Sequence, residues 1–129
     1  MKKEKIHIEY IFDKAGKLSI WNHISTPAGL AEWFADEVMI DSNDKIYTFV
    51  WGKHPMEAEL IGINPNHSIR FRWLEDESTD YYFELSLHKM ELTGAIMLEI
   101  TDFAEKGEEE DITNLWDSQI KILKRNLGL

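Results

Sequence analysis

The chain has 129 residues, 43% of them hydrophobic and 12% aromatic, and it contains no cysteine. This composition predicts one globular domain over residues 1–129 and excludes disulfide and thiolate chemistry. The formal net charge of −10 disfavours binding to nucleic acid or to an anionic membrane, because phosphate groups repel such a chain. No apolar stretch is long enough to span a membrane, and His7 and Glu9 interrupt the only signal-like segment. We therefore expect a cytoplasmic protein.

The one basic cluster is formed by Lys121, Lys124 and Arg125, in the last turns of a predicted C-terminal helix. Cations at a helix C-terminus complement the helix dipole, as do the acidic residues 108–111 at its start. Helix stabilisation explains this cluster better than nucleic-acid binding does, so we expect no nucleic-acid partner.

Residues 5–12 alternate between apolar and polar side chains and predict the first strand. Its apolar face carries Ile6, Ile8, Tyr10 and Phe12. A helix is predicted from residue 14 to residue 24, with Asp13 as its N-cap. The apolar side of this helix carries Leu18, Trp21 and Ile24.

A second, short helix is predicted over residues 27–34. Thr26 is a favoured N-cap, and Pro27 is a favoured first helical residue. The apolar residues of this helix are Leu30, Trp33 and Phe34.

Six more strands follow, each marked by apolar residues at alternate positions and separated by short polar turns. Consecutive strands joined by short turns favour an antiparallel meander. The marking residues are, strand by strand, Val38 and Ile40; Tyr47, Phe49 and Trp51; Met56, Ala58 and Leu60; Ile69, Phe71 and Trp73; Tyr81, Phe83, Leu85 and Leu87; and Ile96, Leu98 and Ile100.

Charged residues gather on the outer face of the middle strands. If the apolar faces of the fourth and fifth strands coincide, the glutamates of one strand lie opposite the arginines of the other. We expect a cross-strand charge ladder there, each pair contributing roughly 0.2–1 kcal/mol. The residues involved are Glu57 and Glu59, Arg70 and Arg72, and then Tyr82 and Glu84 on the sixth strand.

The C-terminal helix is the clearest signal, because its inward residues recur every three or four positions. The inner face of the sheet is the only large apolar surface against which this helix can be buried. We therefore predict an α+β fold with the order β-α-α-β6-α, in which a strongly curved seven-stranded antiparallel sheet wraps around the helix and leaves a hollow. The inward residues are Ile112, Leu115, Trp116, Gln119, Ile120, Leu123 and Leu127.

Metal ligation and catalysis have little support in the sequence. Glu57 and Glu59 lie about 7 Å apart on one strand face, which suits an acid–base pair, but the arginines explain them better. There is neither a Gly-x-Ser-x-Gly elbow nor a Gly-rich phosphate loop. The histidines are scattered and form no helical His-x-x-x-His pair. We therefore predict no catalytic residue, no metal and no cofactor. The histidines are His7, His23, His54, His67 and His88.

Aromatic residues are the remaining candidates for function. The five tryptophans, with Tyr10, Tyr47 and Tyr81, combine apolar surface with an N–H or O–H group. Small-molecule sites are apolar hollows with a few polar groups, although bulky rings also fill cores completely. The candidate cavity residues are Trp21, Trp33, Trp51, Trp73, Tyr81, Trp116 and Gln119.

Two segments carry motifs of a known family: Leu18-x-x-Trp21-x-x-Ile24 followed by Thr26-Pro27-x-x-Leu30-x-x-Trp33-Phe34, and Leu115-Trp116 through Leu123. They resemble the START-like (SRPBCC, or Bet v 1-like) superfamily, and the resemblance extends over essentially the whole chain. The chain is similar in particular to the branch of the activator of Hsp90 ATPase, of which it matches the C-terminal half. This resemblance implies a helix-grip fold with a cavity between the sheet and the last helix. Family members include lipid and hormone binders, polyketide cyclases and co-chaperone domains, without a common catalytic motif.

Three functions follow from these observations. The leading hypothesis is a non-catalytic protein that binds a small hydrophobic or amphipathic ligand, oriented by a tyrosine hydroxyl or an indole N–H. The second is a protein-interaction module similar to the Hsp90 activator, which binds a protein partner or a second copy of itself. The third is a cyclase or hydrolase acting in the hollow. That enzyme needs an inward titratable group, and the candidates are Tyr10, Tyr81 and His23.

Overall fold

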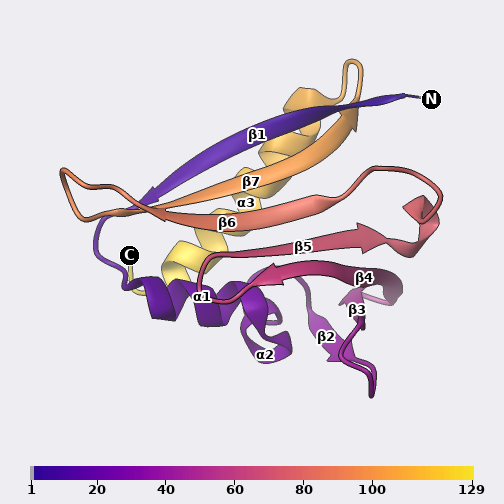
Figure 1. The fold of residues 1–129 in the computed structure, drawn as a ribbon, viewed down its shortest axis with the longest axis horizontal. Coiled ribbons are helices and arrows are strands. Elements are labelled where there is room, and N and C mark those ends of the chain that lie inside the picture. The colour runs from indigo at the N-terminus through magenta and orange to yellow at the C-terminus, as the bar shows by residue number, and fades with distance from the viewer. Residues whose placement is uncertain (1) are drawn as a thin grey trace.

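The computed structural model describes residues 2–129 and contains one seven-stranded antiparallel sheet. The strand order is β1-β7-β6-β5-β4-β3-β2, so the first strand pairs with the last (Figure 1). The predicted order of one strand, two helices, six strands and a long helix is confirmed. The elements are β1 (Lys3–Phe12), α1 (Lys17–Ser25), α2 (Pro27–Leu30), β2 (Glu37–Ile40), β3 (Ile46–Trp51), β4 (His54–Asn64), β5 (Ser68–Trp73), the 3-10 turn η1 (Leu74–Asp76), β6 (Phe83–Lys89), β7 (Ile96–Glu105) and α3 (Glu109–Asn126).

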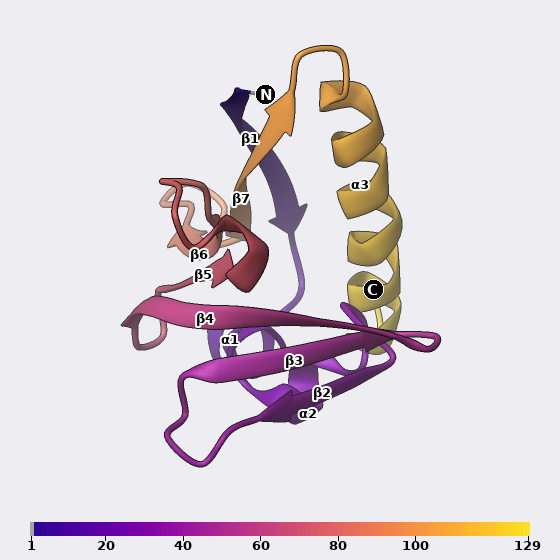
Figure 2. The same cartoon turned by 90° about the vertical axis from the view of Figure 1, so that its right-hand side faces the viewer.

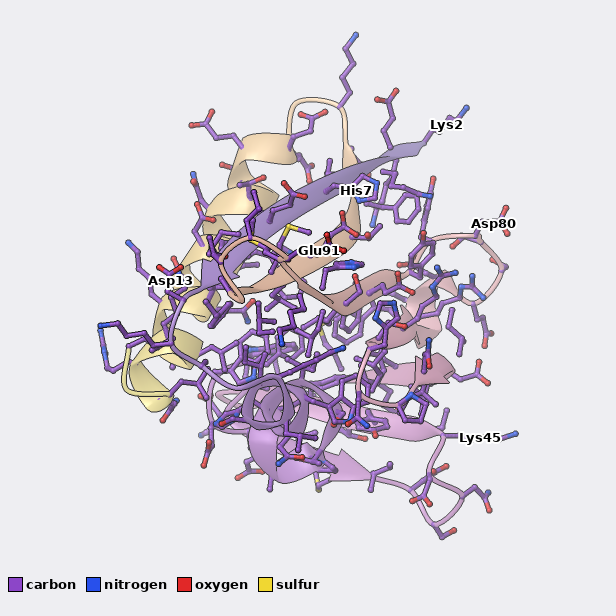
Figure 3. All side chains as sticks on the ribbon, turned by 60° about the vertical axis from the view of Figure 1, so that its left-hand side comes forward. Lys2, His7, Asp13, Lys45, Asp80 and Glu91 are labelled. Atoms are coloured by element: carbon purple, nitrogen blue, oxygen red, sulfur yellow. The ribbon has the colours of Figure 1, made fainter. Side chains whose placement is uncertain are left out.

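The sheet is curled, and α3 lies along its concave side (Figure 2). The strands β2, β3 and β4 run at a steep angle to β1 and β7, while α1 and α2 lie near the C-terminal end of α3. There the Asn126 side chain donates a hydrogen bond to the Glu32 carbonyl oxygen at 2.8 Å. Side chains crowd the interior, whereas Lys45, Asp80 and Glu91 lie on turns and point outward (Figure 3). Within residues 2–129 no helix has both the length and the apolar character needed to cross a membrane.

The apolar face of α3 is buried against the sheet, as predicted, at Trp116, Ile120 and Leu123. Leu115 was predicted to share this face, but its side chain is 59% exposed. Adjacent helical residues are about 100° apart around the axis. A helix that points Trp116 at the sheet therefore turns Leu115 to its flank.

The helix α1 begins at Lys17, later than predicted, and its N-cap is Gly16 in an extended conformation instead of Asp13. Its buried face consists of Ile20, Trp21 and Ile24. Leu18 was predicted on this face and is 66% exposed, because it lies about 120° around the axis from Ile24.

The helix α2 ends at Leu30, earlier than the predicted end at Phe34. Thr26 caps its start as predicted. The backbone N–H groups of Trp33, Phe34 and Ala35 all turn to the carbonyl oxygen of Leu30. Because these three donors converge on one acceptor, the helical ladder stops there. Trp33 and Phe34 consequently lie in the turn that follows α2.

Gly29 in α2 packs directly against the backbone of α1. A Cβ at this position would lie 2.1 Å from the Asn22 carbonyl oxygen and 2.6 Å from the His23 Cα. Relief of this overlap requires a shift of α1, so Gly29→Ala is expected to lower the free energy of unfolding by about 1–3 kcal/mol. Urea denaturation measures the loss. Gly62→Ala is the matched control, because the added Cβ meets only the Arg70 Cβ at 3.7 Å. An equal loss in both variants would contradict the expectation.

The observed strands differ from the predicted ones mainly at their ends. β1 begins at Lys3, ahead of the predicted residue 5, and β7 continues to Glu105, well past Ile100. β6 begins at Phe83, although Tyr81 was predicted to belong to it. The Tyr81 backbone N–H instead bonds to the Thr79 hydroxyl oxygen at 3.0 Å, in a turn ahead of the strand.

The predicted charge ladder is confirmed only in part. Glu59 lies opposite Arg72, as expected, but a bulge in β4 shifts the register beyond this pair. Arg70 forms its ion pair with Glu84 of β6, with 2.8 Å between Nε and Oε1. Glu57 lies outside the paired stretch of β4 and β5.

Candidate functional site

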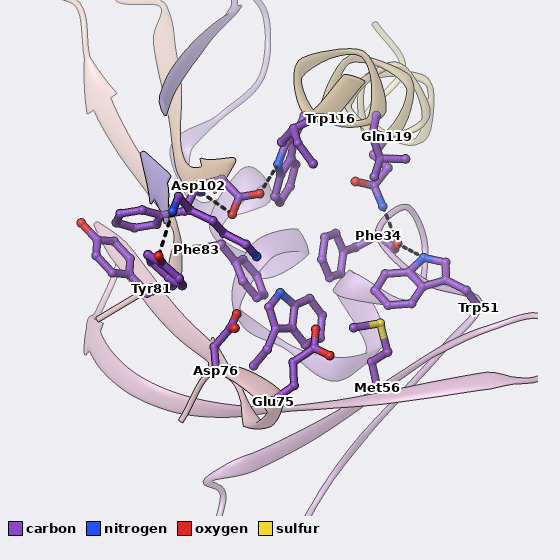
Figure 4. Close-up of a pocket in the computed structure, with 16 residues that line it drawn as sticks. Phe34, Trp51, Met56, Glu75, Asp76, Tyr81, Phe83, Asp102, Trp116 and Gln119 are labelled. Carbon is purple, nitrogen blue, oxygen red and sulfur yellow. Dashed lines mark hydrogen bonds between the residues drawn. The ribbon is translucent and has the colours of Figure 1, made fainter. Parts of the chain in front are cut away.

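A pocket of about 380 Å³ lies between the concave side of the sheet and α3 (Figure 4). Aromatic side chains form most of its wall, and Met56, Ile112 and Leu115 add aliphatic surface. The rings therefore line a hollow without filling it. The aromatic lining residues are Phe34, Trp51, Trp73, Tyr81, Tyr82, Phe83, Phe103 and Trp116.

Five of the seven candidate cavity residues line this pocket, namely Trp51, Trp73, Tyr81, Trp116 and Gln119. The other two lie elsewhere. Trp21 is buried in the core on α1. Trp33 borders a neighbouring hollow of about 410 Å³ and donates its indole N–H to the His23 carbonyl oxygen at 2.8 Å. Both tryptophans therefore belong to the packing of the N-terminal helices.

The Phe34 carbonyl oxygen joins three parts of the chain at the pocket. It accepts a hydrogen bond from Trp51 Nε1 of β3 at 2.8 Å and another from Gln119 Nε2 of α3 at 2.9 Å (Figure 4). The Phe34 ring stacks on Trp116, with 5.6 Å between the ring centroids. The indole of Trp51 and the amide N–H of Gln119 thus hold the pocket together.

Asp102 of β7 places a largely buried carboxyl group in the pocket. Its Oδ2 accepts a hydrogen bond from Trp116 Nε1 at 2.9 Å, and its Oδ1 accepts one from the Phe103 backbone N–H at 2.8 Å. Burial raises the pKa of Asp102; the two hydrogen bonds and the positive charge of Lys3 oppose this effect, and Asp76 adds to it. The pocket therefore contains an inward titratable group.

Asp102 could have been found from the sequence. Ile96, Leu98 and Ile100 face inward on alternate positions of β7, and Asp102 is the next residue of the same parity in a strand that runs to Glu105. Our prediction stopped this alternation at Ile100 and so missed it.

Three further charged residues line the same pocket: Lys3 of β1, and Glu75 and Asp76 of η1. The Lys3 backbone N–H donates to the Tyr81 hydroxyl oxygen at 2.8 Å, which ties β1 to the segment before β6. Glu75 and Asp76 follow Trp73, within one of the polar turns that the sequence predicts between strands. The pocket thus combines apolar rings with several charged groups.

The other residues considered for catalysis lie outside the pocket. The Tyr10 hydroxyl donates to Asp117 Oδ1 at 2.6 Å, and burial together with this carboxylate raises the pKa of Tyr10. His23 Nε2 lies 2.8 Å from Glu32 Oε2. Among the described residues 2–129, no group of three or more metal-ligating side chains is gathered to hold an ion.

Comparisons with solved structures support the fold. BfR322 from Bacteroides fragilis is 47% identical with a TM-score of 0.70, and the match covers 98% of this chain and 92% of that one. The Aha1 dimer from Colwellia psychrerythraea is 16% identical with a TM-score of 0.75, and the match covers 96% of each chain. An uncharacterized protein from Bacillus thuringiensis is 11% identical with a TM-score of 0.78, covering 96% of this chain and 98% of that one. Because the last two proteins have low sequence identity to this chain, their similarity shows a shared fold and nothing more.

A comparison with curated proteins found no match. A family model described as the START-like superfamily domain matches residues 1–129. The chain, with its long C-terminal helix held in a curled antiparallel sheet, therefore belongs to the START-like superfamily.

Proposed function

We propose that this chain binds an apolar or amphipathic small molecule in the pocket between the sheet and α3. The observation that carries the proposal is the hollow of about 380 Å³ bounded by eight aromatic side chains. Ligand sites commonly enclose roughly 300–1,000 Å³ and are lined by apolar and aromatic groups with a few polar ones. Burial of the apolar part of a ligand supplies the affinity, at roughly 25 cal/mol per Å².

The pocket contains more polar groups than we expected. An indole N–H or a tyrosine hydroxyl was predicted to orient the ligand. However, the indole N–H groups of Trp51 and Trp116 already donate to protein oxygens. The indole N–H of Trp73 and the hydroxyl of Tyr81 also lie in the lining and fit the expected role. The carboxylates of Asp102, Glu75 and Asp76 add further polar groups that can contact a ligand.

Titration of the protein with octanol and decanol tests this proposal. Because Trp51, Trp73 and Trp116 line the pocket, we expect saturable changes in tryptophan fluorescence and a melting temperature that rises with ligand concentration. At a hundredfold excess over Kd the stabilisation is roughly 2.7 kcal/mol.

A pair of variants locates the binding. Met56→Trp places a large ring in the pocket, so we expect affinity to fall by about tenfold or more. Met39→Trp makes the same substitution on the exposed face of β2 and should leave affinity unchanged. No saturable binding to the unmodified chain, or equal losses in both variants, would count against the proposal.

A further inference from the structure

Several donors of the pocket are already used within the protein, while one of its carboxylates can accept further hydrogen bonds. Trp51 Nε1 and Gln119 Nε2 both donate to Phe34, and Trp116 Nε1 donates to Asp102. A carboxylate has about four lone-pair sites over its two oxygens, so Asp102 can accept more bonds than the two it receives from the protein. A donor on a ligand therefore finds an acceptor in Asp102, which lies in the same lining as Glu75 and Asp76.

Acidic residues outnumber basic residues in the lining of the pocket. The carboxylates of Glu75, Asp76 and Asp102 turn toward the space enclosed by the rings (Figure 4). Lys3 is the only basic residue of the described lining. When all four groups are ionised, three negative charges face one positive charge. In a partly enclosed site these charges act more strongly on a charged ligand, because Coulomb energies grow as the effective dielectric constant falls. An anionic group entering the pocket is repelled, and a cation is attracted.

The aromatic walls add to the attraction of a cation. The faces of tryptophan and tyrosine rings carry a negative electrostatic potential that attracts ammonium groups within about 6 Å of the ring centroid. Trp51 and Trp73 lie side by side in the wall, with 6.2 Å between their centroids. The chain already uses this attraction at the same pocket, because Lys3 Nζ lies 5.5 Å from the centroid of the Tyr81 ring.

We propose that the ligand of this pocket carries a positively charged nitrogen attached to an apolar body, an inference that rests on the function proposed above. The apolar body occupies the space between Phe34, Trp51 and Phe83, and the nitrogen lies among the carboxylates of Asp102, Asp76 and Glu75. The ligand class is thus an amphipathic amine or quaternary ammonium compound.

Three small molecules of matched size test the charge preference. We expect 4-phenylbutylamine, a cation at neutral pH, to bind about tenfold more tightly than neutral 4-phenylbutanol, because a charge-assisted hydrogen bond is roughly twice as strong as a neutral one. The anion 4-phenylbutyrate should bind more weakly than both. Isothermal titration calorimetry of the whole chain measures the three dissociation constants.

Two double variants locate the preference in the pocket. Glu75→Gln with Asp76→Asn removes two pocket carboxylates, so the preference for the amine over the alcohol should fall by about fivefold or more. Glu77→Gln with Asp80→Asn makes the same charge change at two exposed positions of the same turn region, outside the pocket. This second variant should keep the preference within about twofold of the unmodified chain.

The outcomes separate the two proposals. If the alcohol binds as tightly as the amine, or if the anion binds best, the inference about charge is overturned while the pocket remains a binding site. Equal effects of the two double variants would also overturn it, because the preference would then arise from the overall charge of the chain. If none of the three compounds binds, and octanol and decanol fail as well, the proposed function itself is overturned.

Discussion

Substituting alanine for Trp116 is expected to lower the free energy of unfolding by about 3–5 kcal/mol. The ring is only 4% exposed and stacks on Phe34. Its indole N–H donates to Asp102. The substitution therefore opens a cavity between α3 and the sheet and also removes a donor from a carboxylate that is largely withdrawn from water. Urea denaturation followed by circular dichroism measures the loss.

Leu115→Ala is the control for this prediction, because Leu115 is the preceding residue of α3 and remains mostly exposed. We expect its effect to stay within about 0.5 kcal/mol. Comparable losses at the two positions would mean that Trp116 does not hold α3 against the sheet.

Phe34→Ala should destabilise the protein by a similar amount, about 3–5 kcal/mol. The Phe34 side chain is almost fully buried and lies at the centre of the aromatic cluster beside the pocket. Its ring contacts five others, in Trp33, Phe49, Trp51, Phe83 and Trp116. Alanine would remove all five contacts and join their space to the pocket. Thermal and urea unfolding measure the loss of stability.

Phe34→Leu separates the loss of apolar volume from the loss of the aromatic ring's geometry. Leucine keeps most of the apolar volume, so we expect a cost of about 1.5 kcal/mol or less. The backbone carbonyl that binds Trp51 and Gln119 is present in both variants. If leucine were as damaging as alanine, a specific ring geometry, and not the filled volume, would account for the effect.

The architecture was predictable because its signals are local. Alternation along strands and the three-four spacing in α3 each depend on near neighbours in the chain. The errors concern the ends of elements and the register of strands. Asp13 has the side chain of a good cap, yet α1 begins after Gly16. The bulge in β4 lies between Leu60 and Gly62, where a glycine inside the strand could have indicated it. Arg70 pairs with Glu84 because the register of β5 and β6 places these two residues opposite each other.

The pocket was predictable to a lesser degree. Trp51, Trp73 and Trp116 have the periodicity of inward-facing residues, and all three line it. Trp21 and Trp33 are equally apolar, but the packing of α1 and of the turn after α2 directs them elsewhere. Asp102 could have been found by extending the alternation of β7. Glu75 and Asp76 could not be assigned to the pocket, because their position depends on how the whole sheet curls.

The shared acceptor at Phe34 has a consequence for the tolerance of this region to substitution. A carbonyl oxygen has two lone pairs and needs at least one partner when it is buried. Here Trp51 and Gln119 supply two donors, so either one keeps the oxygen satisfied if the other is replaced. The arrangement is redundant, and one of these two positions can vary without leaving a buried polar atom unpaired.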